Sequence, residues 1–134
     1  MSHLEQKSTD ELARAKEFLD IAQQTLEKSL KTTANRLYFA AERAVVAYLF
    51  AMEIKVSKKH GSIWNAAKTV DMKWHTLLQV LYDLRLQADY GANSTIKILT
   101  KEVISPYISE VSSLLADIEK KIAQKEKEKK TTPL

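Results

Sequence analysis

The sequence predicts an all-α protein, an up-and-down bundle of four long helices and a short connecting one. The 134 residues include only two Gly and two Pro, too few for the many tight turns of a small β-protein. Apolar side chains recur at spacings of three and four residues along most of the chain, as on one face of a helix. Residues 35–52 are apolar on nearly every side, which is typical of a central, buried helix.

The first helix is predicted over residues 9–30. Ser8 and Glu11 match a capping box at its start. Its apolar stripe is Leu12, Ala15, Leu19, Ala22, Leu26 and Leu30. Residues 31–33 form a polar break in which Thr32 or Thr33 can cap the central helix. Because this connection is short, the first two helices are expected to be antiparallel neighbours.

Four polar residues interrupt the central helix: Asn35, Arg36, Glu42 and Arg43. Asn35 and Glu42 are seven residues apart, as are Arg36 and Arg43, so the four form one polar edge of the helix. Buried charge is costly unless it is paired. This edge is therefore expected to face a partner, a wet cleft or another subunit. The alternative is that Glu42 and Arg43 lie in solvent at the margin of the bundle.

The second half of the chain predicts a short helix and two long ones. Gly61 suits a turn or helix stop, and Ser62 can cap the short helix. Asp71 can cap the next helix, which Gly91 ends. Its apolar face is Trp74, Leu77, Leu78, Leu81, Leu84 and Ala88. Thr95 can cap the last helix, and Pro106 should kink it or divide it near Ser105.

The positive charge is concentrated at the C-terminus. The formal net charge is +4, and residues 119–134 alone carry +3. We expect one domain over residues 1–122 and a frayed, Lys/Glu-rich tail over residues 123–134 that favours solubility, with weak contact to RNA as the alternative. The absence of Cys excludes disulfides and thiolate metal sites. Neither a membrane-length apolar run nor a secretory signal is seen, so a soluble cytoplasmic protein is expected.

No metal site or cofactor is predicted. His3, His60 and His75 are scattered, and none has a second His or a carboxylate at ligand spacing on an evident common face. His75, beside Trp74, is interpreted as a surface or packing residue. Neither a Gly-x-Ser-x-Gly elbow nor a clear Ser/His/Asp arrangement is present, so nothing indicates nucleophilic catalysis.

The remaining candidate site is at the end of the fourth helix. Arg85 and Asp89 are four residues apart and can form a salt bridge along one face, with Tyr90 next in the chain. One interpretation is an exposed ion pair that contributes a few tenths of a kcal/mol, roughly 0.3–0.5. The other is that Asp89 positions the Arg85 guanidinium to bind a phosphate or nucleotide beside the aromatic ring of Tyr90.

Three segments resemble a known family. They are N-R-L-Y-F-A-A-E-R-A at residues 35–44, K-K-H-G at 58–61 and L-R-L-Q-A-D-Y-G at 84–91. Together they resemble the HEPN family of small all-helical domains. The resemblance covers most of the chain and implies a HEPN-like helical bundle that forms a homodimer. It also implies frequent pairing with a small nucleotidyltransferase, in gene pairs that often behave as toxin and antitoxin.

Many HEPN proteins are metal-independent ribonucleases with an Arg followed after four to six residues by a His. Here Arg85 matches the arginine, but Tyr90 stands five positions further on and no His follows in that window. An unperturbed phenol, with a pKa of about 10, transfers protons poorly near neutral pH. The resemblance to a His-less R-x-x-A-D-Y branch therefore favours a nucleotide- or RNA-binding protein that partners a nucleotidyltransferase, with Arg85, Asp89, Tyr90, Asn35 and Arg36 at the site.

Two alternatives remain open from the sequence. The first is a metal-independent ribonuclease with a degenerate Arg-x4-Tyr motif, in which Arg85 stabilises the transition state and Tyr90 or His60 assists. The second is a helical scaffold that only dimerises or holds a protein partner. A binding protein is favoured over an enzyme.

Overall fold

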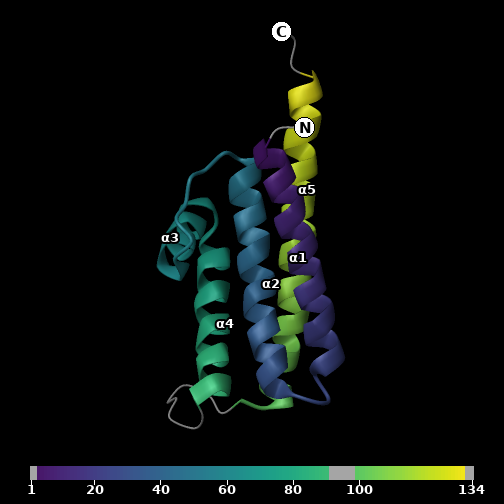
Figure 1. Ribbon diagram of the computed structural model, residues 1–134, viewed down its shortest axis with the longest axis vertical. Coiled ribbons are helices and arrows are strands. Elements are labelled where there is room, and N and C mark those ends of the chain that lie inside the picture. Colours follow the sequence, from purple (N-terminus) through teal and green to yellow (C-terminus); the bar gives the residue numbers. More distant parts are fainter. Residues whose placement is uncertain (1–2, 91–98, 132–134) are drawn as a thin grey trace.

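The computed structural model describes residues 3–90 and 99–131 (Figure 1). Every regular element in these ranges is a helix: α1 (His3–Thr25), α2 (Leu30–Ala51), α3 (His60–Val70), α4 (Met72–Tyr90) and α5 (Lys101–Thr131). The four long helices run alternately down and up, and the short α3 connects α2 to α4 (Figure 1). The predicted all-α up-and-down bundle is confirmed.

Helix α2 is the centre of the bundle. It contacts each of the other four helices, and α1, α4 and α5 surround it in Figure 1. Twelve of its 22 residues are buried, which confirms the prediction of a central helix. The buried core continues on α4, with Trp74, Leu78, Leu81 and Leu84, and on α5. In the part of the chain that the structure describes, each helix is too short or too polar to cross a membrane.

The boundaries of the first two helices differ from the prediction. α1 begins at His3, so Ser8 is a buried residue within the helix, where its Oγ donates to the Ala47 carbonyl at 2.7 Å. α2 begins at Leu30, and Ser29 caps it by accepting a hydrogen bond from the Thr32 N–H at 3.2 Å. Ser and Thr both cap helices well, so the run Ser29 to Thr33 offers several starts, and burial of Thr33 favours the earliest.

The start of α3 also differs. Lys59 is the residue that precedes the helix, so Gly61 lies inside the first turn and Ser62 does not cap it. His60 is therefore the first residue of a helix rather than part of a loop. The predicted role of Asp71 is confirmed, since its Oδ1 accepts a hydrogen bond from the Lys73 N–H at 2.9 Å.

Pro106 does not divide the last helix. α5 is continuous from Lys101 to Thr131, and Thr100 Oγ1 caps it by accepting from the Val103 N–H at 3.1 Å. An internal proline costs about 3 kcal/mol. Burial of five apolar side chains along the helix offsets that cost: Ile104, Val111, Leu114, Leu115 and Ile118. The predicted caps at Gly91 and Thr95 lie outside the described residues.

Candidate functional site

An aromatic cluster fills the space between α2, α3 and α4. The Tyr82 ring is its centre, with ring centroids 5.3 Å from Tyr38, 5.4 Å from His60 and 5.0 Å from Trp64. The Tyr38 and His60 rings lie edge to face at 5.4 Å. Such tilted contacts place the positive edge of one ring against the negative face of another, which holds the rings in fixed orientations.

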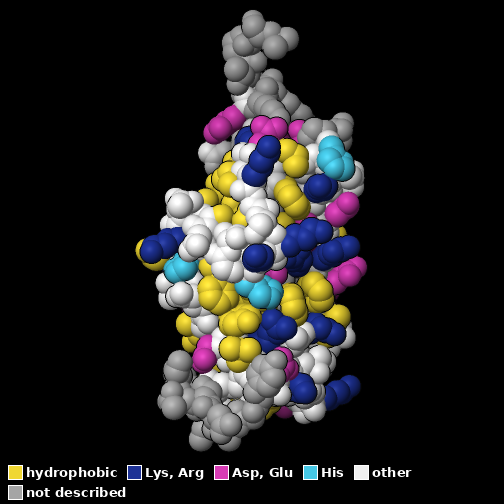
Figure 2. All heavy atoms as spheres, turned by 60° about the vertical axis from the view of Figure 1, so that its left-hand side comes forward, with side chains coloured by type: hydrophobic (Ala, Val, Ile, Leu, Met, Phe, Trp, Pro, Cys, Tyr) yellow, Lys and Arg dark blue, Asp and Glu magenta, His cyan; other side chains and the backbone are white. Residues whose placement is uncertain are grey.

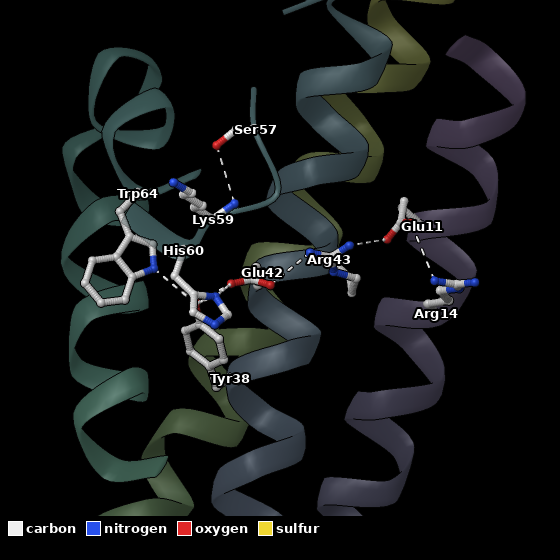
Figure 3. A network of polar contacts seen from close by, with 9 residues as sticks. All are labelled: Glu11, Arg14, Tyr38, Glu42, Arg43, Ser57, Lys59, His60 and Trp64. Carbon is white, nitrogen blue, oxygen red and sulfur yellow. Dashed lines mark hydrogen bonds and ion pairs between the residues drawn. The ribbon is translucent and has the colours of Figure 1, made fainter. Parts of the chain in front are cut away.

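A buried carboxylate lies beneath this cluster. Glu42 is only 2% exposed, and three groups donate hydrogen bonds to it (Figure 3). Arg43 Nη2 donates to its Oε1 at 2.8 Å, and His60 Nδ1 is 2.5 Å from its Oε2. The Tyr38 hydroxyl also donates to Oε2. These partners replace the water that the carboxylate loses on burial.

The charges continue across α2 towards α1. Arg43 Nη1 donates to Glu11 Oε2 at 3.1 Å, and the exposed Arg14 is 3.8 Å from Glu11 Oε1. Figure 3 shows this network running from α1 through α2 to the start of α3. Two carboxylates and two guanidinium groups alternate, so their charges cancel. Of the two alternatives for this edge, the one that places Glu42 and Arg43 in solvent is wrong for Glu42, which is 2% exposed and has Tyr38, Arg43 and His60 of the same chain as partners.

The Tyr38 hydroxyl is held in its neutral form. Burial, and then the hydrogen bond and the charge of Glu42, raise the pKa of this phenol well above its ordinary value. Trp64 Nε1 donates to the same oxygen at 3.1 Å. Tyr38 therefore acts as a donor to Glu42 and an acceptor from Trp64, which fixes both neighbours.

The two ring nitrogens of His60 differ in their surroundings: Nδ1 contacts Glu42, and Nε2 has no such partner among the described residues. Because a carboxylate only accepts, its contact with Glu42 assigns a proton to Nδ1, so that in the neutral imidazole the lone pair is on Nε2. The side chain is 38% exposed, and within residues 3–90 and 99–131 Nε2 makes no hydrogen bond. The imidazole is thus oriented by a buried group while its basic nitrogen stays accessible.

Arg85 lies against the same rings from α4. Its guanidinium carbon is 4.7 Å from the ring centroid of Phe39, 5.6 Å from that of Tyr38 and 5.7 Å from that of Tyr82. Its Nε is buried, is 3.8 Å from Asp89 Oδ2 and makes no hydrogen bond to a described residue. Three aromatic faces hold this cation, so its donors are only loosely engaged.

The predicted residues Asn35 and Arg36 lie next to this region without joining it directly. Arg36 Nη1 donates to Asn35 Oδ1 at 2.6 Å, and its guanidinium carbon lies 5.7 Å from the Phe18 ring centroid. The Phe18 and Phe39 rings contact one another in a tilted arrangement, with centroids 5.9 Å apart. The two arginines therefore flank one pair of phenylalanine rings. α4 extends to Tyr90, whose side chain lies outside the described residues.

On the side that carries α3 and α4, basic and hydrophobic side chains lie next to one another. Figure 2 turns this side forward and shows Lys, Arg and His side chains among hydrophobic ones across the middle of the molecule. Such a surface offers a positive charge for a phosphate and an apolar face for a base.

The pairing of His60 with Glu42 was not predicted from the sequence. One signal was available: Tyr38 and Glu42 are four residues apart, which places a hydroxyl and a carboxylate on one face of the central helix. Nδ1 of His75, which was interpreted as a surface or packing residue, lies 2.8 Å from the Trp64 carbonyl oxygen. Over the described ranges, no three His, Cys, Asp or Glu side chains are grouped so that they could hold a metal ion.

Comparison with known families agrees with this architecture. The family model of the HEPN domain matches residues 9–122, which covers most of α1 to α5. None of the curated proteins matches the chain.

Proposed function

The chain belongs to the HEPN domain family, and on this premise we propose that it binds the phosphate of a nucleotide or of RNA at Arg85. The family is typically concerned with nucleotides or RNA, which gives the class of ligand. The observation that carries the proposal is the placement of Arg85 against three rings with its donors loosely engaged.

A guanidinium in this setting suits a phosphate. The rings fix its plane, and the Asp89 carboxylate, at 3.8 Å, guides it without accepting a close hydrogen bond. Its planar fork can then donate two parallel hydrogen bonds to phosphate oxygens. At 22% exposure the side chain is largely desolvated and still reachable, which strengthens its attraction for an anion.

Neighbouring groups extend this site in our proposal. The half-buried rings of Phe39 and Tyr82 offer faces on which a base can stack. Arg36, held by Asn35 on the far side of the Phe18 and Phe39 pair, supplies a second positive charge for an adjacent phosphate. Tyr90, the last residue of α4, is included because it follows Asp89 directly.

The proposal includes partners. The protein forms a homodimer and pairs with a small nucleotidyltransferase, as one half of a toxin–antitoxin-like pair. Family membership supports this part, which predicts that the two proteins co-purify when they are expressed together.

A second function, metal-independent cleavage of RNA, is favoured by one observation. The His60 imidazole contacts the same two rings, Tyr38 and Tyr82, that Arg85 contacts. The third possibility is a helical scaffold, for which Arg85 has no role in binding.

Titration of the purified protein with AMP, ATP and a 2′-O-methyl RNA oligonucleotide tests the binding function. Arg85→Gln should weaken binding at least about tenfold, because one charge-assisted hydrogen bond contributes roughly 1.5–3 kcal/mol. Arg14→Gln is the matched control: Arg14 is 66% exposed on α1 and should leave binding unchanged. If none of these probes binds, or if both variants bind like wild type, the proposal fails and the scaffold is favoured.

A further inference from the structure

We propose that His60 is the proton-transferring group of this site and accepts the proton of a ribose 2′-hydroxyl next to a phosphate that Arg85 holds. The inference rests on the proposed phosphate-binding role of Arg85. It places the base on α3, at the first residue of that helix, and needs no contribution from Tyr90.

The rings bring His60 and Arg85 to one place. The imidazole is 5.4 Å from both the Tyr38 and the Tyr82 centroids, and the guanidinium carbon is 5.6 Å and 5.7 Å from the same two rings. A base and a cation that border the same two side chains can reach one phosphodiester and its adjacent ribose. These residues come from α2, α3 and α4, so their meeting depends on the fold.

His60 has the features of an oriented base. Glu42 fixes the proton on Nδ1, so that Nε2 carries the lone pair, and a carboxylate in this position also stabilises the imidazolium that forms when Nε2 takes a proton. Tyr38 and Arg43 donate to Glu42 and keep it in place. An imidazole can accept and return a proton near neutral pH, whereas a phenol held neutral cannot act as the base.

A purely structural ion pair explains less of this arrangement. A histidine that only satisfies Glu42 has no need of an accessible Nε2, yet the side chain is 38% exposed beside a carboxylate that is 2% exposed. The exposed basic nitrogen is the feature that points to a ligand.

The segment before His60 favours a nucleic-acid chain over a mononucleotide. Lys55, Lys58 and Lys59 are exposed, and none forms an ion pair with a described residue. The same segment contains one acid, Glu53, so its net charge is positive. Lysines spaced along a loop next to the site can contact successive phosphates of a strand.

The reaction balances without a further reactant. The 2′-oxygen loses its proton to His60 Nε2 and attacks phosphorus, the bond from phosphorus to the 5′-oxygen breaks, and a 2′,3′-cyclic phosphate forms. The 5′-oxygen takes a proton from water, and the imidazolium returns its proton to water. Arg85 donates to the phosphate oxygens, whose negative charge increases in the transition state.

The test measures cleavage and binding on the same variants. A short single-stranded RNA is incubated in EDTA with wild type, His60→Gln and Arg85→Gln, and binding is measured with the uncleavable 2′-O-methyl oligonucleotide. Wild type should yield products ending in 2′,3′-cyclic phosphate. His60→Gln should cleave at least about a hundredfold more slowly and still bind. His3→Gln, an exposed histidine of α1, should cleave like wild type.

Binding also shows that a variant is folded, and Gln at position 60 keeps a donor for Glu42.

Glu42→Gln tests the positioning role, since it should change the pH dependence of the cleavage rate, whereas a structural role would lower that rate equally at every pH. Binding without cleavage by wild type, or equal cleavage by His60→Gln, overturns the role of His60 and leaves the proposed binding function standing. Absence of both binding and cleavage removes both proposals.

Discussion

Arg43 and Arg85 meet the same requirement, a mostly buried cation, in different ways. Arg43 lies between two carboxylates and donates to Glu42 at 2.8 Å and to Glu11 at 3.1 Å. Arg85 lies on the rings of Phe39, Tyr38 and Tyr82, and its nearest carboxylate, Asp89, is 3.8 Å away. The side chains have nearly the same exposure, 23% and 22%, so burial alone does not separate them.

The two guanidinium groups differ in how far their N–H donors remain available to a ligand. Arg43 has its charge neutralised and its donors used on both sides, so we expect its removal to destabilise the protein and to leave ligand binding unaffected. Aromatic faces stabilise the charge of Arg85 but accept no strong hydrogen bond from it in the plane of the guanidinium. An anion can still bind there. The α1 side of α2 is therefore expected to serve stability, and the α3 and α4 side to serve function.

Of the substitutions that test this comparison, Glu42→Ala should cause the largest loss of unfolding free energy. It leaves Arg43 and the Tyr38 hydroxyl without their shared acceptor in a buried place. Breaking a buried charge pair of this kind costs about 3–5 kcal/mol. The measurement is the free energy of unfolding in urea. Glu17→Ala, an exposed glutamate of α1, is the control and should change stability by less than about 0.5 kcal/mol.

If Glu42→Ala and Glu17→Ala had similar stabilities, the network would contribute nothing to folding. The division between the two sides of α2 would then be wrong.

Arg43→Gln and Arg85→Gln test the comparison directly. Arg43→Gln removes two charged hydrogen bonds and should cost about 1.5–3 kcal/mol of unfolding free energy. Arg85→Gln removes contacts with rings and should cost only about 0.5–1 kcal/mol. Denaturant unfolding of both variants, with oligonucleotide titration of the same samples, gives the two readouts. Equal losses of stability, or loss of binding in Arg43→Gln alone, would contradict the assignment.

The sequence predicts the bundle well because helical spacing is a local property. Trp74, Leu78, Leu81 and Leu84 were placed on one face of the fourth helix from their spacing alone, and all four are buried. The start of α2 was misplaced because several neighbouring residues can cap a helix, and the choice depends on which of them the core buries. Pro106 was expected to kink or divide the last helix, and the continuous α5 contradicts the division. The burial of neighbouring side chains, which offsets the cost of the proline, depends on the other helices and cannot be read from the sequence of one helix.

The site was predictable only in part. Arg85 and Asp89 were found as neighbours on one helix turn, and they do form an ion pair. The pairing of Glu42 with His60 spans 18 residues and a connecting segment, so no spacing rule reveals it. The same holds for the three rings around Arg85, two of which belong to α2. The candidate site is formed by contacts between helices, and such contacts depend on packing rather than on spacing within one helix.

Tyr38→Phe should have an intermediate effect. The variant removes the hydroxyl that donates to Glu42 and accepts from Trp64, so each loses one partner. We expect a loss of about 1–2 kcal/mol in unfolding free energy. Tyr107→Phe, on α5, is the matched control and should be nearly neutral. A Tyr38→Phe protein as stable as wild type would show that Glu42 is satisfied without this donor.

The stability difference between wild type and Tyr38→Phe should depend on pH. Burial raises the pKa of Tyr38 in the folded state, so the folded protein keeps this proton while the unfolded chain releases it above about pH 10. The unfolded state then binds fewer protons, and wild type loses up to about 1.4 kcal/mol per pH unit relative to the variant. Urea unfolding of both proteins at about pH 8 and about pH 11 measures this difference in unfolding free energy. A difference that stays constant would contradict the buried neutral phenol.

The smallest effect is expected from truncation after residue 122, because we expect the folded domain to end there. In the last part of α5, Lys125 Nζ donates to the Ala51 carbonyl at 2.7 Å. One such bond contributes about 0.5–1.5 kcal/mol, and water can replace it at the end of α2. The melting temperature should therefore fall by less than about 5 °C. Lys125→Ala in the full chain should reproduce most of that fall. A much larger fall on truncation alone would mean that residues 123–131 belong to the folded unit and that α5 is stabilised along its whole length.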